Sequence, residues 1–128
     1  MKTRILLLGI LVTMLSSFRP GTGPMMTFTE TKYNFGFIRQ GEIVSHEFEF
    51  TNTGDGPLLI SECEVACTCT TVDFPKEPIA PNAKAKIKVT FDSKSAMDRQ
   101  EREVIVKSNA GNSPQSVVFK CVVLKPKN

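Results

Sequence analysis

Four cysteines and one histidine are the residues of this 128-residue chain whose side chains could carry thiol or metal chemistry. The cysteines are Cys63, Cys67, Cys69 and Cys121. In an exported chain, an even number of cysteines indicates disulfides, and four cysteines allow three pairings that spacing does not distinguish. The single histidine, His46, excludes the multi-histidine sites of many zinc and iron proteins.

The positions of the cysteines along the expected strands favour one long-range pairing. Cys121 falls in step with apolar residues of the last strand, so we expect it to be buried, and Cys63 is the partner that we predict for it. A disulfide closing that loop would stabilise the fold by about 4 kcal/mol in the chain-entropy model. Cys67 and Cys69 lie two residues apart, at the limit of disulfide reach on a regular strand, so a bridge between them requires a bulge or a turn.

Three interpretations of the segment Cys67-Thr68-Cys69-Thr70 stay open: a redox pair, a soft-metal site for Cu(I) or zinc, and a structural feature. Two cysteines leave a metal shell incomplete, and His46 belongs to a different strand. A reactive thiolate needs nearby positive charge, whereas the sequence neighbours Glu62, Glu64 and Asp73 are acidic. The structural interpretation is therefore favoured, with redox and metal binding as alternatives.

Other signatures of catalysis are missing from the sequence. It contains no nucleophile-elbow pattern, no phosphate loop and no paired metal carboxylates. His46 shares a strand face with apolar residues, which is typical of a structural histidine. Net charge is +3, and it falls to +1 without residues 1–18 because Lys2 and Arg4 are then absent. We therefore predict no enzyme, no cofactor and no nucleic-acid partner.

The first 18 residues have the pattern of a secretory signal peptide. Lys2 and Arg4 precede the apolar run 5–15, which is too short to span a bilayer. Small residues at Ser16 and Ser17 place the cleavage near Ser17. The alternative is an uncleaved signal, which would be the chain's only membrane attachment. We predict an exported protein, periplasmic or extracellular, with a flexible Gly- and Pro-rich lead-in at 19–26.

The rest of the chain, residues 27–125, shows a hydrophobic period of two, which is typical of strands with one wet face. We predict strands near 26–30, 33–38, 42–52, 57–63, 66–72, 84–92, 102–108 and 115–125, the first two forming one interrupted strand. Three prolines exclude a central strand at 74–82, and 93–103 is expected to be a loop with a helical turn. About seven short antiparallel strands predict an all-β, immunoglobulin-like β-sandwich.

In such a sandwich the second and fifth strands are neighbours, which gives the charged residues a structural role. Glu47 and Glu49 of segment 42–52 would then face Lys84, Lys86 and Lys88 of segment 84–92. Opposite charges on facing strands stabilise a sheet by about 0.2 to 1 kcal/mol per pair. We favour this interpretation over an anion-binding patch.

A series of short motifs resembles the domain of unknown function 1573 family. The motifs are Phe35-Gly36-Phe37-Ile38, Gln40-Gly41-Glu42, Phe48 to Gly54, Pro57 to Ile60, Cys67-Thr68-Cys69-Thr70, Pro78-Ile79-Ala80-Pro81 and Ser108-Asn109-Ala110. Thr68 and Asn82 stand where that family usually has glycine, and 97–100 also lacks a customary glycine. The resemblance implies an immunoglobulin-like sandwich akin to the Hydin and major-sperm-protein group, usually exported, with no agreed biochemical function.

These observations predict an exported, non-catalytic module that binds another cell-envelope or secreted component. Free strand edges, loop tips and the region of Cys67 and Cys69 are the expected contact surfaces, and a sheet edge that accepts a partner's strand is the expected mode. The alternative is a thiol-redox or soft-metal protein that uses the Cys67 and Cys69 pair.

Overall fold

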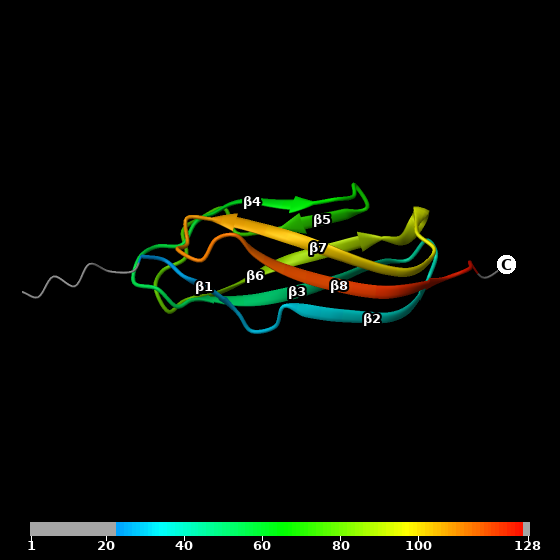
Figure 1. Cartoon of the computed structure of the whole chain (residues 1–128), viewed down its shortest axis with the longest axis horizontal. Helices are drawn as coiled ribbons and strands as arrows, with labels where there is room; N and C mark the ends of the chain where they lie inside the picture. Colours follow the sequence, from blue (N-terminus) through cyan, green and yellow to red (C-terminus); the bar gives the residue numbers. More distant parts are fainter. Residues whose placement is uncertain (1–22, 127–128) are drawn as a thin grey trace, which may run out of the picture.

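Alternating apolar residues form eight strands in the computed structural model, which describes residues 23–126. Figure 1 shows them as two layers stretched along one axis. The predicted signal peptide, residues 1–18, lies outside the described residues. The elements are β1 (Met26–Phe28), β2 (Lys32–Arg39), β3 (Ile43–Asn52), β4 (Ile60–Val65), β5 (Thr70–Asp73), β6 (Lys84–Asp92), the 3-10 turn η1 (Ser93–Ser95), β7 (Asp98–Ser108) and β8 (Gln115–Leu124).

The strands form two four-stranded sheets, in the orders β1-β3-β6-β5 and β2-β8-β7-β4. All pairs are antiparallel except β2 with β8, which is parallel. The predicted all-β, immunoglobulin-like sandwich is confirmed. The interrupted first strand is also present: β1 belongs to one sheet, and the chain then crosses to the other sheet as β2 (Figure 1).

The core lies between the sheets and is centred on aromatic rings. The Phe119 ring of β8 lies 5.6 Å from the Phe35 ring of β2 and 5.4 Å from the Phe91 ring of β6, measured between centroids. Phe119 and Phe91 are fully buried. Because Phe91 belongs to the opposite sheet, Phe119 joins the two layers, and burial of such rings is the main stabilising contribution.

One buried polar side chain fastens the end of β3 to three neighbouring segments. Asn52 is fully buried, and its Nδ2 donates to the carbonyls of Gly56 (2.7 Å) and Ile79 (2.9 Å). Its Oδ1 accepts from the backbone N–H groups of Met25 (3.3 Å) and Gly54 (3.1 Å). A buried amide with all of these partners satisfied gives the loop after β3 a single conformation.

Residues 23–26, the last four of the predicted lead-in, pack against this same loop. Gly23 donates its N–H to the Asp55 carboxylate (2.7 Å), and Met26 is buried at the start of β1. A Cβ atom on Gly54 would lie only 2.0 Å from the Gly23 carbonyl oxygen, so Gly54 is required for this close approach. The folded part of the chain therefore begins no later than Gly23.

The facing charges of β3 and β6 occur as predicted. Glu47 pairs in register with Lys88, and Glu49 with Lys86. The ion pairs that form are diagonal ones, Lys86 to Glu47 at 3.5 Å and Lys84 to Glu49 at 3.9 Å. All four side chains of these pairs are solvent-exposed by more than a third, so each pair stabilises the sheet by at most about 1 kcal/mol.

Two predicted segments differ from the structure. The segment 93–103 holds the expected helical turn, η1, but β7 already begins at Asp98, where the sequence lacks a glycine. Asp98 adopts a left-handed φ of 64°, as does Asn82 at 66°, so each takes the conformation that glycine would otherwise supply. The predicted strand 66–72 is a turn up to Cys69, and β5 begins only at Thr70.

Candidate functional site

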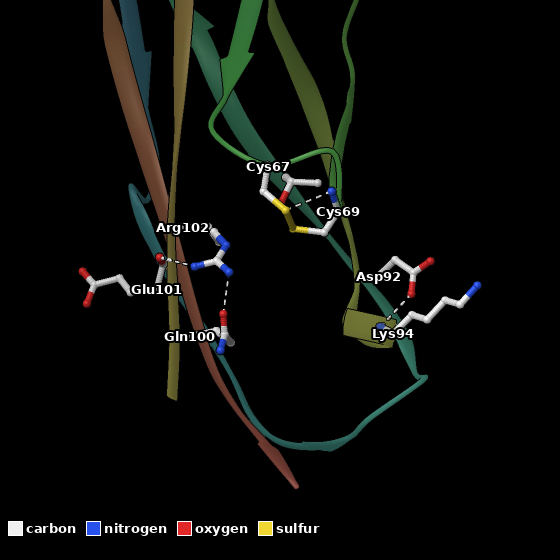
Figure 2. Close-up of a disulfide and its surroundings, with 8 residues drawn as sticks. Cys67, Cys69, Asp92, Lys94, Gln100, Glu101 and Arg102 are labelled. Carbon is white, nitrogen blue, oxygen red and sulfur yellow. Dashed lines mark hydrogen bonds between the residues drawn. A yellow bond between two sulfur atoms is a disulfide. The ribbon is translucent and has the colours of Figure 1, made fainter. Parts of the chain in front are cut away.

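The turn between β4 and β5 carries Cys67 and Cys69, which form a disulfide with their Cα atoms 5.1 Å apart (Figure 2). The turn is independently held by backbone hydrogen bonds: Thr70 N–H donates to the Cys67 carbonyl (3.2 Å), and Asp92 N–H donates to the Cys69 carbonyl (2.9 Å). A three-residue loop gains only about 1.6 kcal/mol from closure in the chain-entropy model. The disulfide therefore contributes little to holding the fold together.

The predicted disulfide between Cys63 and Cys121 is wrong, because both residues are free thiols. They belong to β4 and β8, and β7 lies between these strands in the sheet. Along β7, Cys63 faces Val106 whereas Cys121 faces Gln100. An offset of six residues is roughly 20 Å, far beyond the Cα separation that a disulfide spans. The predicted burial of Cys121 is confirmed at 2% exposure.

Burial also makes these two free thiols weak nucleophiles. Burial raises the pKa of Cys63 to about 11, a rise that Lys76 opposes and Glu62 reinforces. Burial raises the pKa of Cys121 as well, against the opposing charge of Arg102. A raised thiol pKa lowers the thiolate fraction at neutral pH and hence the reactivity of the residue.

We therefore expect Cys63 in the folded protein to be alkylated slowly by iodoacetamide at pH 8, where a thiol of pKa 11 is roughly one part in a thousand thiolate. Its rate should rise steadily as the pH approaches 11. Peptide mapping by mass spectrometry measures this, with protein unfolded in urea as the control. Equal rates for folded and unfolded protein at pH 8 would contradict the prediction.

Sequence reasoning missed Arg102, which the structure places beside the disulfide turn. Arg102 alternates with Val104 and Val106 along β7, and both valines are fully buried, so its side chain points toward the interior. Its guanidinium donates to Gln100 Oε1 (2.5 Å) and to the Glu101 carbonyl (3.2 Å), as Figure 2 shows. Extending the alternation of β7 back from Val104 would have identified it.

The charge of Arg102 lacks an acidic counterpart within residues 23–126, where none of the ion pairs includes it. Its Nε is buried and has no hydrogen-bond partner among the described residues. A buried, unsatisfied donor costs free energy in the folded state, so this position requires an explanation.

Cavities open on both sides of the disulfide turn. One, of about 560 Å³, is lined by Glu64, Val65, Ala66, Cys67, Glu101, Arg102, Glu103 and Ile105. The other, of about 240 Å³, is lined by Cys67, Thr68, Cys69, Asp92, Lys94 and Ser95. Of the three acidic neighbours named from the sequence, only Glu64 lines either cavity, but Glu101, Glu103 and Asp92 line them too, together with the cations Arg102 and Lys94. The surroundings of the cysteine pair therefore contain carboxylates, as its sequence neighbours indicated, and also two cations that they did not indicate.

His46 lies in a different setting, and the structure gives it a structural role. Its Nε2 pairs with Glu30 Oε1, and its ring stacks on Tyr33 with centroids 3.5 Å apart. Within residues 23–126, no group of three or more His, Cys, Asp or Glu side chains is placed to hold a metal ion. None of the helical turns in that range is long and apolar enough to cross a membrane.

A second candidate surface is the open side of β3. Its β6 side is paired from Ile43 to Thr51, but β1 pairs with it only at 50–52 before the chain crosses to the other sheet. The backbone carbonyl of Glu49 and the backbone N–H of Thr53 form hydrogen bonds on the β1 side of the strand, whereas the backbone N–H of Asn52 forms one on the β6 side. Because backbone groups alternate along a strand, the N–H and C=O groups of Ser45 and Glu47 point toward the open side.

This open side continues onto the outer edge of β2, and both edges carry exposed apolar groups. Phe37 on β2 is 75% exposed and Ile43 at the start of β3 is 66% exposed. Between the two strands, the stacked rings of Tyr33 and His46 seal the interior. An unpaired backbone edge beside exposed apolar side chains is suited to pairing with an extended segment of another chain.

Comparisons with known proteins agree with this architecture. A protein of unknown function from Porphyromonas gingivalis W83 is 16% identical, with a TM-score of 0.70 over 79% of this chain and 47% of that one, so this chain spans about half its length. PapD-like domain 7 of human CEP192 is 11% identical, with a TM-score of 0.64 over 84% of this chain and 89% of that one. WR4, a major-sperm-protein family member from C. elegans, is 10% identical, with a TM-score of 0.50 over 78% and 98%.

At these identities the structural neighbours show the fold alone, and none of the curated proteins compared with this chain matches it. The family comparison is more specific. The model described as "Protein of unknown function (DUF1573)" matches residues 26–123, which include the disulfide turn, both sheets and the open side of β3. The chain therefore belongs to the DUF1573 family of proteins of unknown function.

Proposed function

We propose that this protein is an exported, non-catalytic immunoglobulin-like module that binds another envelope or secreted protein by adding a partner strand to the open side of β3. The observation that carries the proposal is the run of β3 from Ile43 to Glu47: its β6 side is fully paired, and no strand within residues 23–126 pairs with its other side. An added strand would bond to the free backbone groups of Ser45 and Glu47, and its side chains could contact Phe37 and Ile43.

The other sheet edges are less suited to a partner strand. β1 has three residues and β5 has four, too short to guide a long pairing. β4 presents Glu62 and Glu64, and both lie within 4.0 Å of Lys107. β2 has a register shift between Asn34 and Phe37, and such irregularities are a common device against edge-to-edge pairing.

A proline at Ser45 tests this proposal directly. Ser45→Pro removes an N–H that points to the open side, so the ladder to β6 keeps its hydrogen bonds and the domain should remain folded. A photo-crosslinking residue at Glu47 should capture a specific envelope protein from cells, and Ser45→Pro should reduce that product at least about tenfold, since several ladder bonds are lost together.

Ser45→Ala is the matched control, because it removes the hydroxyl but keeps the backbone N–H. It should leave the crosslinked product unchanged, and a crosslinker at Lys88, which faces Glu47 inside the sheet, should not capture the same protein. A product that survives Ser45→Pro would exclude strand addition at this edge. A protein that is captured by the crosslinker at Lys88 but not by the crosslinker at Glu47 would place the binding surface on the face of the sheet.

Export is a separate part of the same proposal and needs its own test. The support for export is the apolar run 5–15 after Lys2 and Arg4. Intact mass of the protein recovered from the periplasm should show the loss of a segment ending near Ser17. A full-length mass in the membrane fraction would indicate an uncleaved signal, and a full-length mass in the cytoplasm would exclude export.

A further inference from the structure

We propose that the Cys67–Cys69 disulfide exchanges with external thiols, and that Arg102 assists by stabilising the Cys67 thiolate. The site would accept two electrons from a dithiol partner protein, for which glutathione can serve as a small-molecule probe. This inference goes beyond the binding role proposed above and does not depend on it.

The disulfide is placed for exchange rather than for holding the fold. It joins residues two apart in a turn that is also held by two backbone hydrogen bonds, from Thr70 N–H to the Cys67 carbonyl and from Asp92 N–H to the Cys69 carbonyl. Both cysteines are only half-buried, and cavities open on both sides of the turn. Disulfides that are accessible to an attacking thiolate, and that the fold does not need, are those that exchange.

Two observations mark Cys67 as the sulfur that leaves as a thiolate. First, Cys67 Sγ already accepts a hydrogen bond from the Cys69 backbone N–H at 3.1 Å. Second, Cys67 lines the same cavity as Arg102, whereas Cys69 does not. The positive charge of Arg102, which is in none of the ion pairs of residues 23–126, would favour an anionic sulfur in that cavity.

Within residues 23–126, none of the acidic groups around the turn is in an ion pair with Arg102. Glu64 of β4 is bonded to Lys107, Nζ to Oε1 at 2.5 Å. Glu101 and Glu103 of β7 are exposed and line the same cavity, but neither is in an ion pair with Arg102. On the β6 side, the carboxylate of Asp92 accepts the backbone N–H of Lys94 at 3.0 Å, and the ammonium of Lys94 adds a second cation.

The exchange can be written as a balanced sequence. A thiolate of the dithiol partner attacks Cys69 Sγ from the cavity that Cys69 and Lys94 line, the S–S bond breaks, and Cys67 leaves as a thiolate. The partner's second thiol loses its proton to water and attacks the partner's own sulfur in the mixed disulfide, which releases Cys69. The products are an oxidised partner and two protein thiols, after the protein takes up two protons.

Redox titration of the full exported chain tests the proposal. Protein carrying Cys63→Ser is equilibrated in glutathione buffers, alkylated and mapped by mass spectrometry, so that Cys67 and Cys69 are counted without Cys63 and separately from the buried Cys121. The pair should convert from disulfide to dithiol within the range of these buffers while circular dichroism shows the fold unchanged. A pair that stays oxidised even in excess dithiothreitol would overturn the proposal.

Arg102 is a positioning residue in this scheme, and its role has a separate readout. Arg102→Gln should slow reduction by glutathione at pH 7 by about five- to tenfold, since the leaving thiolate loses its cation. It should also move the pH at which reduced Cys67 becomes reactive to iodoacetamide upward. Arg102→Lys keeps the charge and should restore both values.

Arg99→Gln is the matched control, because Arg99 is an exposed arginine on the same strand with the same charge. It should exchange within twofold of the parent protein. If Arg102→Gln and Arg99→Gln exchange equally fast, the assistance by Arg102 is excluded. A slowed Arg102→Gln variant that Arg102→Lys does not rescue would indicate a packing effect and would also exclude it.

Discussion

Asn52→Ala is expected to lower the free energy of unfolding by about 3 kcal/mol. The substitution removes four hydrogen bonds of a fully buried side chain. The Gly56 carbonyl and the N–H groups of Met25 and Gly54 lose their partner, whereas the Ile79 carbonyl keeps the Leu58 N–H. A buried group that loses its partner costs about 1 to 3 kcal/mol, and here several lose it together. Urea unfolding followed by circular dichroism measures the loss.

Asn109→Ala is the matched control for this prediction. Asn109 also links two loops, because it accepts from Leu59 N–H (2.8 Å) and donates to the Pro57 carbonyl (3.1 Å), but it is exposed. Water can replace both bonds, so the loss should be about 1 kcal/mol or less. Equal losses for the two variants would show that burial does not decide the contribution of these asparagines.

Phe119→Ala should lower the free energy of unfolding by about 4 kcal/mol. The ring is fully buried and touches rings from both sheets, so its removal leaves a cavity at the point where the layers meet. Domains of this size have total stabilities of about 5 to 15 kcal/mol, so the substitution removes a large part of the free energy of unfolding. Thermal and urea unfolding curves both measure the effect.

Phe37→Ala removes the same side chain from a site that is 75% exposed, and it serves as the control. Its effect on stability should stay within about 0.5 kcal/mol. A large loss in this variant would mean that Phe37 is covered in solution. A small loss in Phe119→Ala would contradict the position of that ring between the sheets.

The strands could be predicted because their physical cause is local. Alternation of apolar and polar residues decides which face of a strand is buried, and it located β3, β6 and β8 to within about two residues. The pairing of β3 with β6 followed from the sandwich topology and from the charges of Glu47, Glu49 and the facing lysines. A turn at Cys67 and Cys69 was predicted as the condition for a disulfide between them, because residues two apart on a regular strand lie at the limit of disulfide reach.

The site could be predicted only in part, because its geometry depends on which strands are neighbours. Cys63 and Cys121 were paired on burial alone, and burial does not report that β7 lies between their strands. Arg102 was overlooked because β7 was expected to begin at 102, whereas a left-handed Asp98 lets the strand start earlier. Its closeness to Cys67 arises from β7 and the β4–β5 turn meeting at one end of the sandwich (Figure 2).

The parallel pairing of β2 with β8 has a mechanical consequence. The ladder runs from Lys32 opposite Val118 to Arg39 opposite Leu124. In Figure 1 the described chain enters at one end of the long axis and leaves at the other. Tension between its two ends would slide β2 and β8 past each other in opposite directions, so their hydrogen bonds would bear the force together in shear instead of opening one by one. Because forced unfolding is governed by the unfolding rate, this domain should withstand stretching better than its equilibrium stability alone would suggest.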